Sequence, residues 1–545
     1  MGLPRKSVCG FPVIEHADFG KEVVSYGSSK NSNKICLGKI FSMGTETETE
    51  VNLDINSLTM HTFVTGSTGS GKSNTVYEIL HQLHNIYGIP FLVVEPAKGE
   101  YKNVFGRFSD ISVYGTNPKK TNLLKINPFS FPEDVHILEH LDRLVEIFNV
   151  CWPMYAAMPA ILKEAIEKAY IATGWDLVLS ENSKGRKFPN FADVLEHIEA
   201  VINESKYSAD SKGDYSGALL TRVSSLTTGL NGLIFSTDEI SDAKLFDESV
   251  IVDLRRVGST ETKSLIMGLL IMKLNEHRMS SGKINSSLSH VTVLEEAHNL
   301  LKRTSTEQSS ESANLLGKSV ELLANSIAEM RTYGEGFIIA DQSPGLLDMS
   351  VIRNTNTKII LRLPDRSDRE LVGYAAGLDD EQIDELSKLK KGVAAVYQND
   401  WVEPVLVQVN KCHLGERTYD ITAAADVAKS TIREQLVNFL IQGRVSEKLD
   451  FSIPEIEKGL ASLELSSMNS EFVEEQIAEY KENGSLEIWE DNDLRFLAKR
   501  LSDILGVRMK VENCVLTATS DEELTSMLER IVLQISPDAS KSKIL

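Results

Sequence analysis

The pattern of apolar and polar positions predicts alternating strands and helices through most of the chain. A buried-strand pattern over Met60–Thr65 leads into a glycine-rich turn, and an amphipathic helix over Ser73–Tyr87 follows. Gly88 and Pro90 end that helix, and a second buried strand is predicted at Phe91–Glu95. This succession of strand, loop, helix and strand is a βαβ unit, and such units build parallel sheets.

The same alternation returns in the second half of the chain. Helical periodicity over Thr260–Met279 and Ser319–Tyr333 separates short apolar runs that are typical of buried strands. We therefore predict an α/β fold with a mainly parallel sheet. The strands predicted here, of which the last two form a hairpin, are Ser249–Leu254, Val291–Leu294, Gly336–Ala340, Lys358–Leu363, Gly392–Tyr397 and Val402–Val409.

Three segments depart from this pattern. Residues 33–60 alternate apolar and polar positions, which favours a short β-rich lead-in, and Asp134–Ala172 and Asn190–Ser205 have helical periodicity. Beyond about residue 420 the pattern is that of acidic amphipathic helices, for example Asn469–Glu482 and Asp493–Leu505. We divide the chain into a β-rich N-terminal segment (1–58), an α/β core (59–127 and 215–418), a helical insertion (128–214) and an acidic, mostly helical C-terminal region (419–545).

The net charge of −21 changes the partners that we expect. Proteins that bind nucleic acid usually present a basic surface, because contacts to phosphate dominate their affinity. Much of the acidic excess lies in the C-terminal region, and a ring can line a narrow channel with Lys and Arg while its exterior stays acidic. The charge therefore lowers the expectation of DNA binding without excluding it.

Targeting signals and cysteines indicate the cytoplasm. The longest apolar runs are far shorter than the roughly 20 residues that span a bilayer, so no membrane association is expected. Residues 1–20 have no continuous apolar stretch of the kind found in secretory signals. The five cysteines include no C-x-x-C pair, which favours reduced, structural thiols over a disulfide framework or a zinc ribbon.

The glycine-rich turn satisfies the phosphate-binding pattern G-x-x-x-x-G-K-[ST] between a predicted strand and a predicted helix. Its glycines let the backbone curl so that several N–H groups face the β-phosphate, and the helix N-terminus adds partial positive charge. Lys72 is expected to neutralise the β- and γ-phosphates of ATP, and Ser73 to ligate Mg²⁺. A turn without a ligand is the minor alternative. The residues expected to bind the nucleotide are Gly66, Thr68, Gly69, Ser70, Gly71, Lys72, Ser73 and Asn74.

Two adjacent carboxylates follow the predicted strand Val291–Leu294. Because side chains alternate faces along a strand, Glu295 and Glu296 are expected to differ in role. We assign Glu295 to Mg²⁺, directly or through water, and Glu296 to the general base that polarises the attacking water. Solvated charges at a strand end are the alternative, which the phosphate-binding turn makes the minority interpretation. The strand Ser249–Leu254, between the two motifs in the chain, suggests a strand inserted beside the P-loop strand, as in additional-strand catalytic-glutamate ATPases.

Polar residues near the later strands complete the predicted site. Gln342 follows a buried strand at the carboxyl edge of the sheet, where open α/β sheets bind ligands. It is a candidate to sense the γ-phosphate or to position water, and a simple turn residue is the alternative. An arginine from a neighbouring subunit can stabilise transition-state charge. We take Arg331 and Arg362 as candidates, with Arg353 and Arg366 beside them, and the sequence does not choose among these four.

Two polar loops are candidates to reach a strand in a central pore. One is Lys302–Lys318, which follows the acidic pair, and the other contains Lys119 and Lys120. A loop that leaves the active strand can couple hydrolysis to movement, although solvated loops are the more common alternative for both.

Together these motifs resemble the HerA/FtsK superfamily of P-loop ATPases, and its HerA-like branch in particular. The resemblance spans about residues 35–410 and implies a RecA-like core that uses ATP and Mg²⁺. It also implies a homohexameric ring with double-stranded DNA in its channel, and a partner effector that is a nuclease or a Sir2-like NADase. The short N-terminal segment favours the bacterial, anti-phage defence branch. The four ordered motifs are Thr65–Ser73, Glu95–Tyr101, Glu295–His298, and Gln342 ahead of Asn356–Arg362.

Two functions follow as expectations. The first is an ATP-hydrolysing ring motor, a DNA translocase or helicase that works with the effector. The alternative is a nucleotide-gated hexameric scaffold that activates the partner enzyme without true translocation, which the strong acidity favours. A membrane-coupled DNA pump is disfavoured, because the sequence contains no predicted membrane span.

Overall fold

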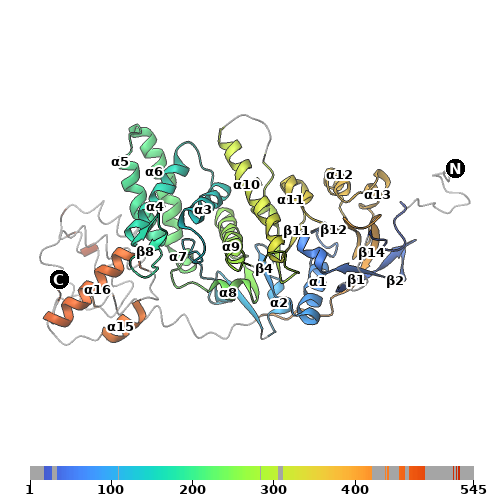
Figure 1. Cartoon of the computed structure of the whole chain (residues 1–545), viewed down its shortest axis with the longest axis horizontal. Coiled ribbons are helices and arrows are strands. Elements are labelled where there is room, and N and C mark those ends of the chain that lie inside the picture. The colour runs from blue at the N-terminus through green and yellow to red at the C-terminus, as the bar shows by residue number, and fades with distance from the viewer. Residues whose placement is uncertain are drawn as a thin grey trace, which may run out of the picture.

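One sheet lies at the centre of the protein in the computed structural model (Figure 1). The described residues are 17–26, 33–108, 110–282, 284–304 and 311–419, with 453–460, 465–484 and positions 436, 439, 440, 486, 520, 523, 526 and 527 beyond them. Within these residues the strands are β1 (Lys34–Ser42), β2 (Thr45–Asp54), β3 (Thr62–Thr65), β4 (Phe91–Glu95), β5 (Ile111–Gly115), β6 (Asn122–Leu123), β7 (Trp175–Asp176), β8 (Glu181–Asn182), β9 (Ser249–Asp253), β10 (His290–Glu295), β11 (Glu335–Asp341), β12 (Thr357–Ile360), β13 (Val393–Gln398) and β14 (Val405–Val409).

The sheet is parallel in its centre and antiparallel toward one edge. Twelve of the described strands follow the order β2-β1-β14-β13-β12-β3-β11-β10-β4-β9-β5-β6. All pairs from β12 to β6 are parallel. The pairs from β12 through β13, β14 and β1 to β2 are antiparallel. The prediction of an α/β fold with a mainly parallel sheet is confirmed.

The strand inserted between the two motif strands is not the one that we expected. β11 lies between β3, which leads into the glycine-rich turn, and β10, which ends at the acidic pair. β9 instead pairs with β4 and β5, on the far side of β10. The prediction was wrong because crossover connections, and not position along the chain, decide which strands become neighbours. The carboxyl end of β11 therefore lies beside both motifs.

Helices cover both faces of the sheet, as a buried parallel sheet requires. Along β4, Phe91 and Val93 join one hydrophobic core, whereas Leu92 and Val94 join the other. None of the helices among the described residues combines the length and the apolar character needed to cross a membrane. The α-helices are α1 (Lys72–Tyr87), α2 (Tyr101–Phe105), α3 (Ile137–Cys151), α4 (Met158–Ala172), α5 (Phe191–Glu204), α6 (Ala209–Thr227), α7 (Gly229–Ile234), α8 (Asp242–Phe246), α9 (Thr260–Ser280), α10 (Glu311–Glu329), α11 (Met349–Arg353), α12 (Arg366–Ala375), α13 (Asp380–Glu385), α15 (Ile453–Leu460) and α16 (Ser467–Asn483).

The β-rich N-terminal segment continues the central sheet. Gly38 of β1 pairs with Val409 of β14, and β2 is the terminal strand beside β1. A Cβ atom at Gly38 would lie 2.0 Å from the backbone oxygen of Gln408. This close approach requires glycine, because any other side chain would push the two backbones apart. The predicted boundary near residue 58 stays a prediction, since the sheet itself is continuous there.

Replacing Gly38 with Ala should separate β1 from β14. The added methyl group meets backbone rather than a flexible side chain, and overpacking of this kind costs about 1–3 kcal/mol. We expect a lower midpoint of thermal unfolding, measured by circular dichroism. Gly213→Ala in α6 is the matched control, because its Cβ would meet nothing within 4 Å and alanine favours a helix. Equal midpoints for the two variants would contradict the prediction.

The helical segment forms one end of the molecule, with α4, α5 and α6 side by side (Figure 1). α6 continues across residue 214, the predicted end of the insertion, and that boundary stays a prediction. α16 packs against it, because Asn190 donates to the backbone oxygen of Leu465 at 3.0 Å and the backbone N–H of Ser467 donates to Asp193 at 2.9 Å. α16 corresponds to the predicted helix Asn469–Glu482, whereas the predicted helix Asp493–Leu505 lies outside the described residues.

Candidate nucleotide site

The glycine-rich turn joins β3 to α1, as the sequence predicts. Gly71 immediately precedes α1 and has a φ of 118°, a conformation that side chains other than glycine rarely adopt. Its Cβ would also approach the Cα atom of Gly392 to 3.3 Å. The turn places the positive end of the α1 dipole at the edge where the parallel strands end, a position that favours anions.

A cavity of about 650 Å³ opens beside this turn. Three polar atoms at the turn, the Oγ atoms of Ser67 and Ser70 and Nζ of Lys72, are buried without a hydrogen-bond partner among the described residues. Buried polar groups are nearly always hydrogen-bonded, so these three atoms fit a bound phosphate chain. The cavity is lined by turn residues and three further lysines, including Ser67, Thr68, Gly69, Gly71, Lys72, Ser73, Asn74, Lys98, Lys391 and Lys411.

Lys72 joins the turn to the acidic pair. Its Nζ lies 3.8 Å from Oε2 of Glu295 and 3.6 Å from Oε1 of Glu296. The lysine side chain is 5% exposed, and those of the two glutamates are 7% and 16% exposed. Charge interactions at this depth are screened less than at the surface. The two sequence motifs therefore meet in one pocket, with one cation facing two carboxylates.

The backbone of Glu296 explains why both carboxylates reach the same lysine. β10 ends at Glu295, and Glu296 has the left-handed conformation, with a φ of 47° and a ψ of 49°. The alternation of faces along a strand, from which we expected different roles for the two side chains, therefore stops at Glu295. A non-glycine residue in this conformation stores strain, which is typical of functional sites.

Glu295 is held by a partner from α2. The phenolic O–H of Tyr101 donates to Oε1 of Glu295 at 2.6 Å. Burial raises the pKa of Glu295, and Lys72 and the Tyr101 hydrogen bond act against this rise. Both partners therefore favour the charged form that a metal ligand needs.

The residues beside Glu295 fit a magnesium ion. A cavity of about 10 Å³ lies between Ser73, Glu95, Glu295 and Glu296, which is about the space of one water-sized group. Hydroxyl and carboxylate oxygens are the donors that Mg²⁺ prefers. Burial raises the pKa of Glu95 to about 7, and its carboxylate accepts the backbone N–H of Glu100 at 2.8 Å. Ser73 and Glu295 would hold the ion at this point.

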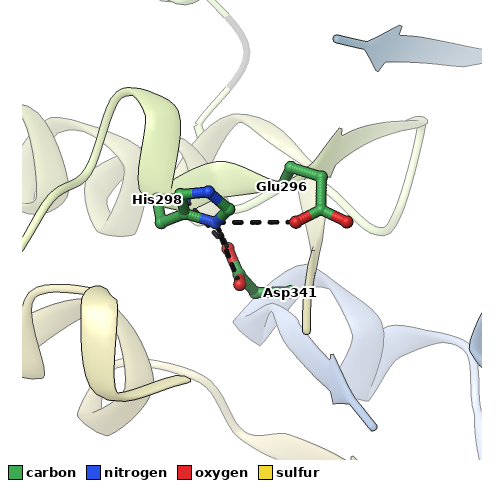
Figure 2. A group of neighbouring side chains, drawn as sticks. All are labelled: Glu296, His298 and Asp341. Carbon is green, nitrogen blue, oxygen red and sulfur yellow. Dashed lines mark hydrogen bonds and ion pairs between the residues drawn. The ribbon is translucent and has the colours of Figure 1, made fainter. Parts of the chain in front are cut away.

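The end of β11 connects to the turn and to the acidic pair. Oγ1 of Thr68 donates to Oε1 of Gln342 at 2.8 Å, so Gln342 lies beside the turn, and its predicted role as a sensor stays a prediction. The preceding residue, Asp341, faces His298, as Figure 2 shows. The hydrogen bond to Asp341 is the main cause of a raised pKa for His298.

Comparison with known proteins agrees with this geometry. The family model of the helicase HerA central domain matches residues 35–274. The DNA double-strand break repair helicase HerA of Sulfurisphaera tokodaii is 24% identical over 386 residues, which are 69% of this chain and 71% of the relative. Over its core the chain is similar to the HerA-like ATPases. Its activity is therefore ATP hydrolysis by a RecA-like core.

Solved structures agree with this fold. VirB4 of Thermoanaerobacter pseudethanolicus superposes with a TM-score of 0.54 at 17% identity, over 70% of this chain and 98% of that structure. The plasmid coupling protein TrwB in complex with ADP and Mg²⁺ has a TM-score of 0.50 at 12% identity, over 74% of this chain and 98% of that structure.

The predicted arginines lie at opposite edges of the central sheet. Arg362 follows β12 at the nucleotide edge; it is exposed, and its backbone oxygen accepts the N–H of Ser67 at 2.9 Å. Arg331 precedes β11 at the other edge and is not brought to the turn, and Arg353 ends α11 ahead of β12. Arg366 is exposed and pairs with Glu370 at 2.8 Å. Arg362 alone among these four adjoins the turn within one subunit.

Asn74 has a different environment from the other predicted ligands. Its side chain donates to the backbone oxygen of Asn410 at 2.8 Å and accepts the N–H of Cys412 at 3.0 Å. It lines the cavity, but both of these contacts fix the segment after β14. Its assignment to the nucleotide stays a prediction.

The predicted pore loops are described in part. Lys302 bridges to Leu347, and α10 begins at Glu311, while residues 305–310 lie outside the described residues. Lys119 and Lys120 are exposed on the turn after β5. Neither loop contacts the turn through a hydrogen bond in the described part of the chain, and their role in a pore stays a prediction.

Three residues of the site escaped assignment from the sequence: Tyr101, His298 and Asp341. Tyr101 and His298 lie within motifs that the family resemblance includes, Glu95–Tyr101 and Glu295–His298. Their chemistry was not assigned because each depends on a partner far along the chain. Asp341 directly precedes Gln342, and an acidic residue at the end of a strand beside the P-loop strand could have been its signal.

Proposed function

We propose that the chain is an ATP-driven motor that acts on double-stranded DNA as a ring of identical subunits.

 The effector is a separate partner, a nuclease or a Sir2-like NADase, and the setting is anti-phage defence. The observation that carries the proposal is the meeting of Lys72, Glu295 and Glu296 beside the glycine-rich turn. The names of the HerA relatives, which include DNA repair helicases, support DNA as the substrate on which the motor acts.

Each residue of the site has a separate role in the proposed hydrolysis of ATP. Lys72 turns from the acidic pair to the β- and γ-phosphates, where it offsets their charge. Glu296 accepts the proton of the attacking water, and Gln342, which is hydrogen-bonded to Thr68, contacts the γ-phosphate or that water. Mg²⁺, held by Ser73 and Glu295, would neutralise charge on the phosphate oxygens.

A neighbouring subunit would complete this site. Arg362 is exposed next to the turn, and Arg331 is exposed at the opposite edge of the sheet. A residue at the opposite edge can reach a nucleotide only across a subunit interface, so Arg331 is the stronger candidate to act in trans. An arginine supplied by a neighbour makes hydrolysis depend on ring assembly.

The proposed substrate is tested by measuring ATP turnover with and without duplex DNA, together with displacement of a protein roadblock. We expect DNA to raise kcat severalfold, on the order of 1 kcal/mol in the barrier, and the roadblock to be displaced in one direction. Single-stranded DNA of the same length is the control. An ATP turnover rate that DNA does not change, together with no displacement of the roadblock, would favour the nucleotide-gated scaffold. The net charge of −21 supports that alternative.

The proposed partner and setting need a separate experiment. Bacteria that carry the chain with its neighbouring genes should resist phage, and Lys72→Ala should remove that resistance. Affinity purification of the wild-type chain should recover a nuclease or an NADase in a fixed ratio to the ring. Resistance that survives the substitution would contradict a role for ATP hydrolysis in defence.

A further inference from the structure

Three side chains meet at the carboxyl ends of β10 and β11: Glu296, His298 and Asp341 (Figure 2). Nδ1 of His298 lies 2.9 Å from Oδ2 of Asp341 and 3.6 Å from Oε2 of Glu296. The three ligand-type atoms all lie within 4.8 Å of one another. The imidazole therefore stands between the assigned general base and a second carboxylate.

The chemistry of the two groups decides which one donates the hydrogen bond between His298 and Asp341. A carboxylate accepts hydrogen bonds, so Nδ1 of His298 must carry the proton that it shares with Asp341. Asp341 is fully buried and also accepts the backbone N–H groups of His298 and Ser343, each at 2.9 Å. Asp341 is therefore a fixed anchor, and it sets the orientation of the imidazole.

The two carboxylate oxygens of Glu296 face different partners. In the structure Oε1 of Glu296 faces Lys72 at 3.6 Å, whereas Oε2 faces His298. When the Lys72 ammonium moves to the phosphates, the first interaction is lost and the second can remain. His298, whose Nδ1 hydrogen is donated to Asp341, would then be the group that stays beside Oε2 and keeps the base in place.

We propose that His298, anchored by Asp341, positions Glu296 for proton abstraction during ATP hydrolysis. The proposal rests on the assignment of Glu296 as general base. His298 is a positioning residue, because it acts through Glu296. Asp341 directly precedes Gln342, which is hydrogen-bonded to Thr68, so the end of β11 contacts both His298 and the glycine-rich turn.

Three substitutions of His298 test the proposal. Asn places its amide nitrogen where Nδ1 lies, whereas Gln places its amide nitrogen nearer to Nε2, and Ala removes both. We expect His298→Ala and His298→Gln to lower kcat about 10–100-fold, since a small misplacement of a catalytic group has effects of this size. His298→Asn should retain most of the wild-type kcat. The binding constant for a fluorescent ATP analogue should stay unchanged in all three variants.

Controls separate this proposal from a general structural role. Thermal midpoints of the Asn and Gln variants should be equal, because a purely structural loss would lower stability and turnover together. Adding His298→Ala to Glu296→Gln should produce no further loss of residual turnover, since the two residues act as a unit. Equal loss in the Asn and Gln variants, or unchanged kcat in all three, would overturn the proposal. Full turnover in Glu296→Gln alone would instead refute the base assignment on which it rests.

Discussion

Glu296→Gln should abolish ATP turnover while ATP binding persists. Gln has the same shape as Glu but cannot accept the proton of the attacking water, and general base catalysis contributes about 10²–10⁴-fold. The turn, Lys72 and Ser73 remain in place, so the nucleotide still has its phosphate contacts. Phosphate release measures kcat, and a fluorescent ATP analogue measures binding.

Two variants accompany this test. Glu48→Gln on β2 is the control for loss of one negative charge, because its side chain is 98% exposed and lies far along the sheet from the turn. Glu295→Gln should weaken the dependence on Mg²⁺ instead of removing the base. Turnover that survives in Glu296→Gln would show that another group, or water alone, accepts the proton.

Lys72→Ala should remove both tight nucleotide binding and turnover. Its ammonium is buried, has no hydrogen-bond partner among the described residues, and faces the site between the turn and the acidic pair. Loss of one preorganised charge at a phosphoryl-transfer site costs at least about 10²-fold in rate. Without Lys72, the pKa of Glu295 should rise further, because this lysine now opposes the effect of burial.

Isothermal titration with a non-hydrolysable ATP analogue measures the binding loss. Lys168→Ala in α4 is the matched control, since Lys168 forms its ion pairs with Glu164 and Glu204 on the helical segment. Circular dichroism verifies that each variant is folded. Wild-type affinity in Lys72→Ala would contradict the phosphate site at the turn.

Much of the fold could be predicted because its signals are local. The strand at Phe91–Glu95 was predicted with the bounds that the structure has, since its five residues are all buried and Pro90 precedes them. The turn and its helix were predicted from glycine, lysine and serine at fixed spacing. In each case a short stretch of chain contains the whole physical reason.

The remaining features depend on pairs of residues that are distant in the chain. β11 became the neighbour of β3 through a crossover that no local pattern encodes. Tyr101 meets Glu295 across 194 positions, and Asp341 meets His298 across 43. The left-handed turn at Glu296 could not be predicted either, because non-glycine residues seldom adopt it.

The terminal strand β2 has a consequence for how copies of the chain can assemble. In the described part of the chain it has a neighbour on one side, and its segment Thr45–Glu50 alternates threonine with glutamate. If two such edges paired, their glutamates would face like charges, which destabilises strand pairing. The proposed ring would therefore be built through other surfaces, and the like charges on β2 would disfavour end-to-end pairing of sheets into fibres.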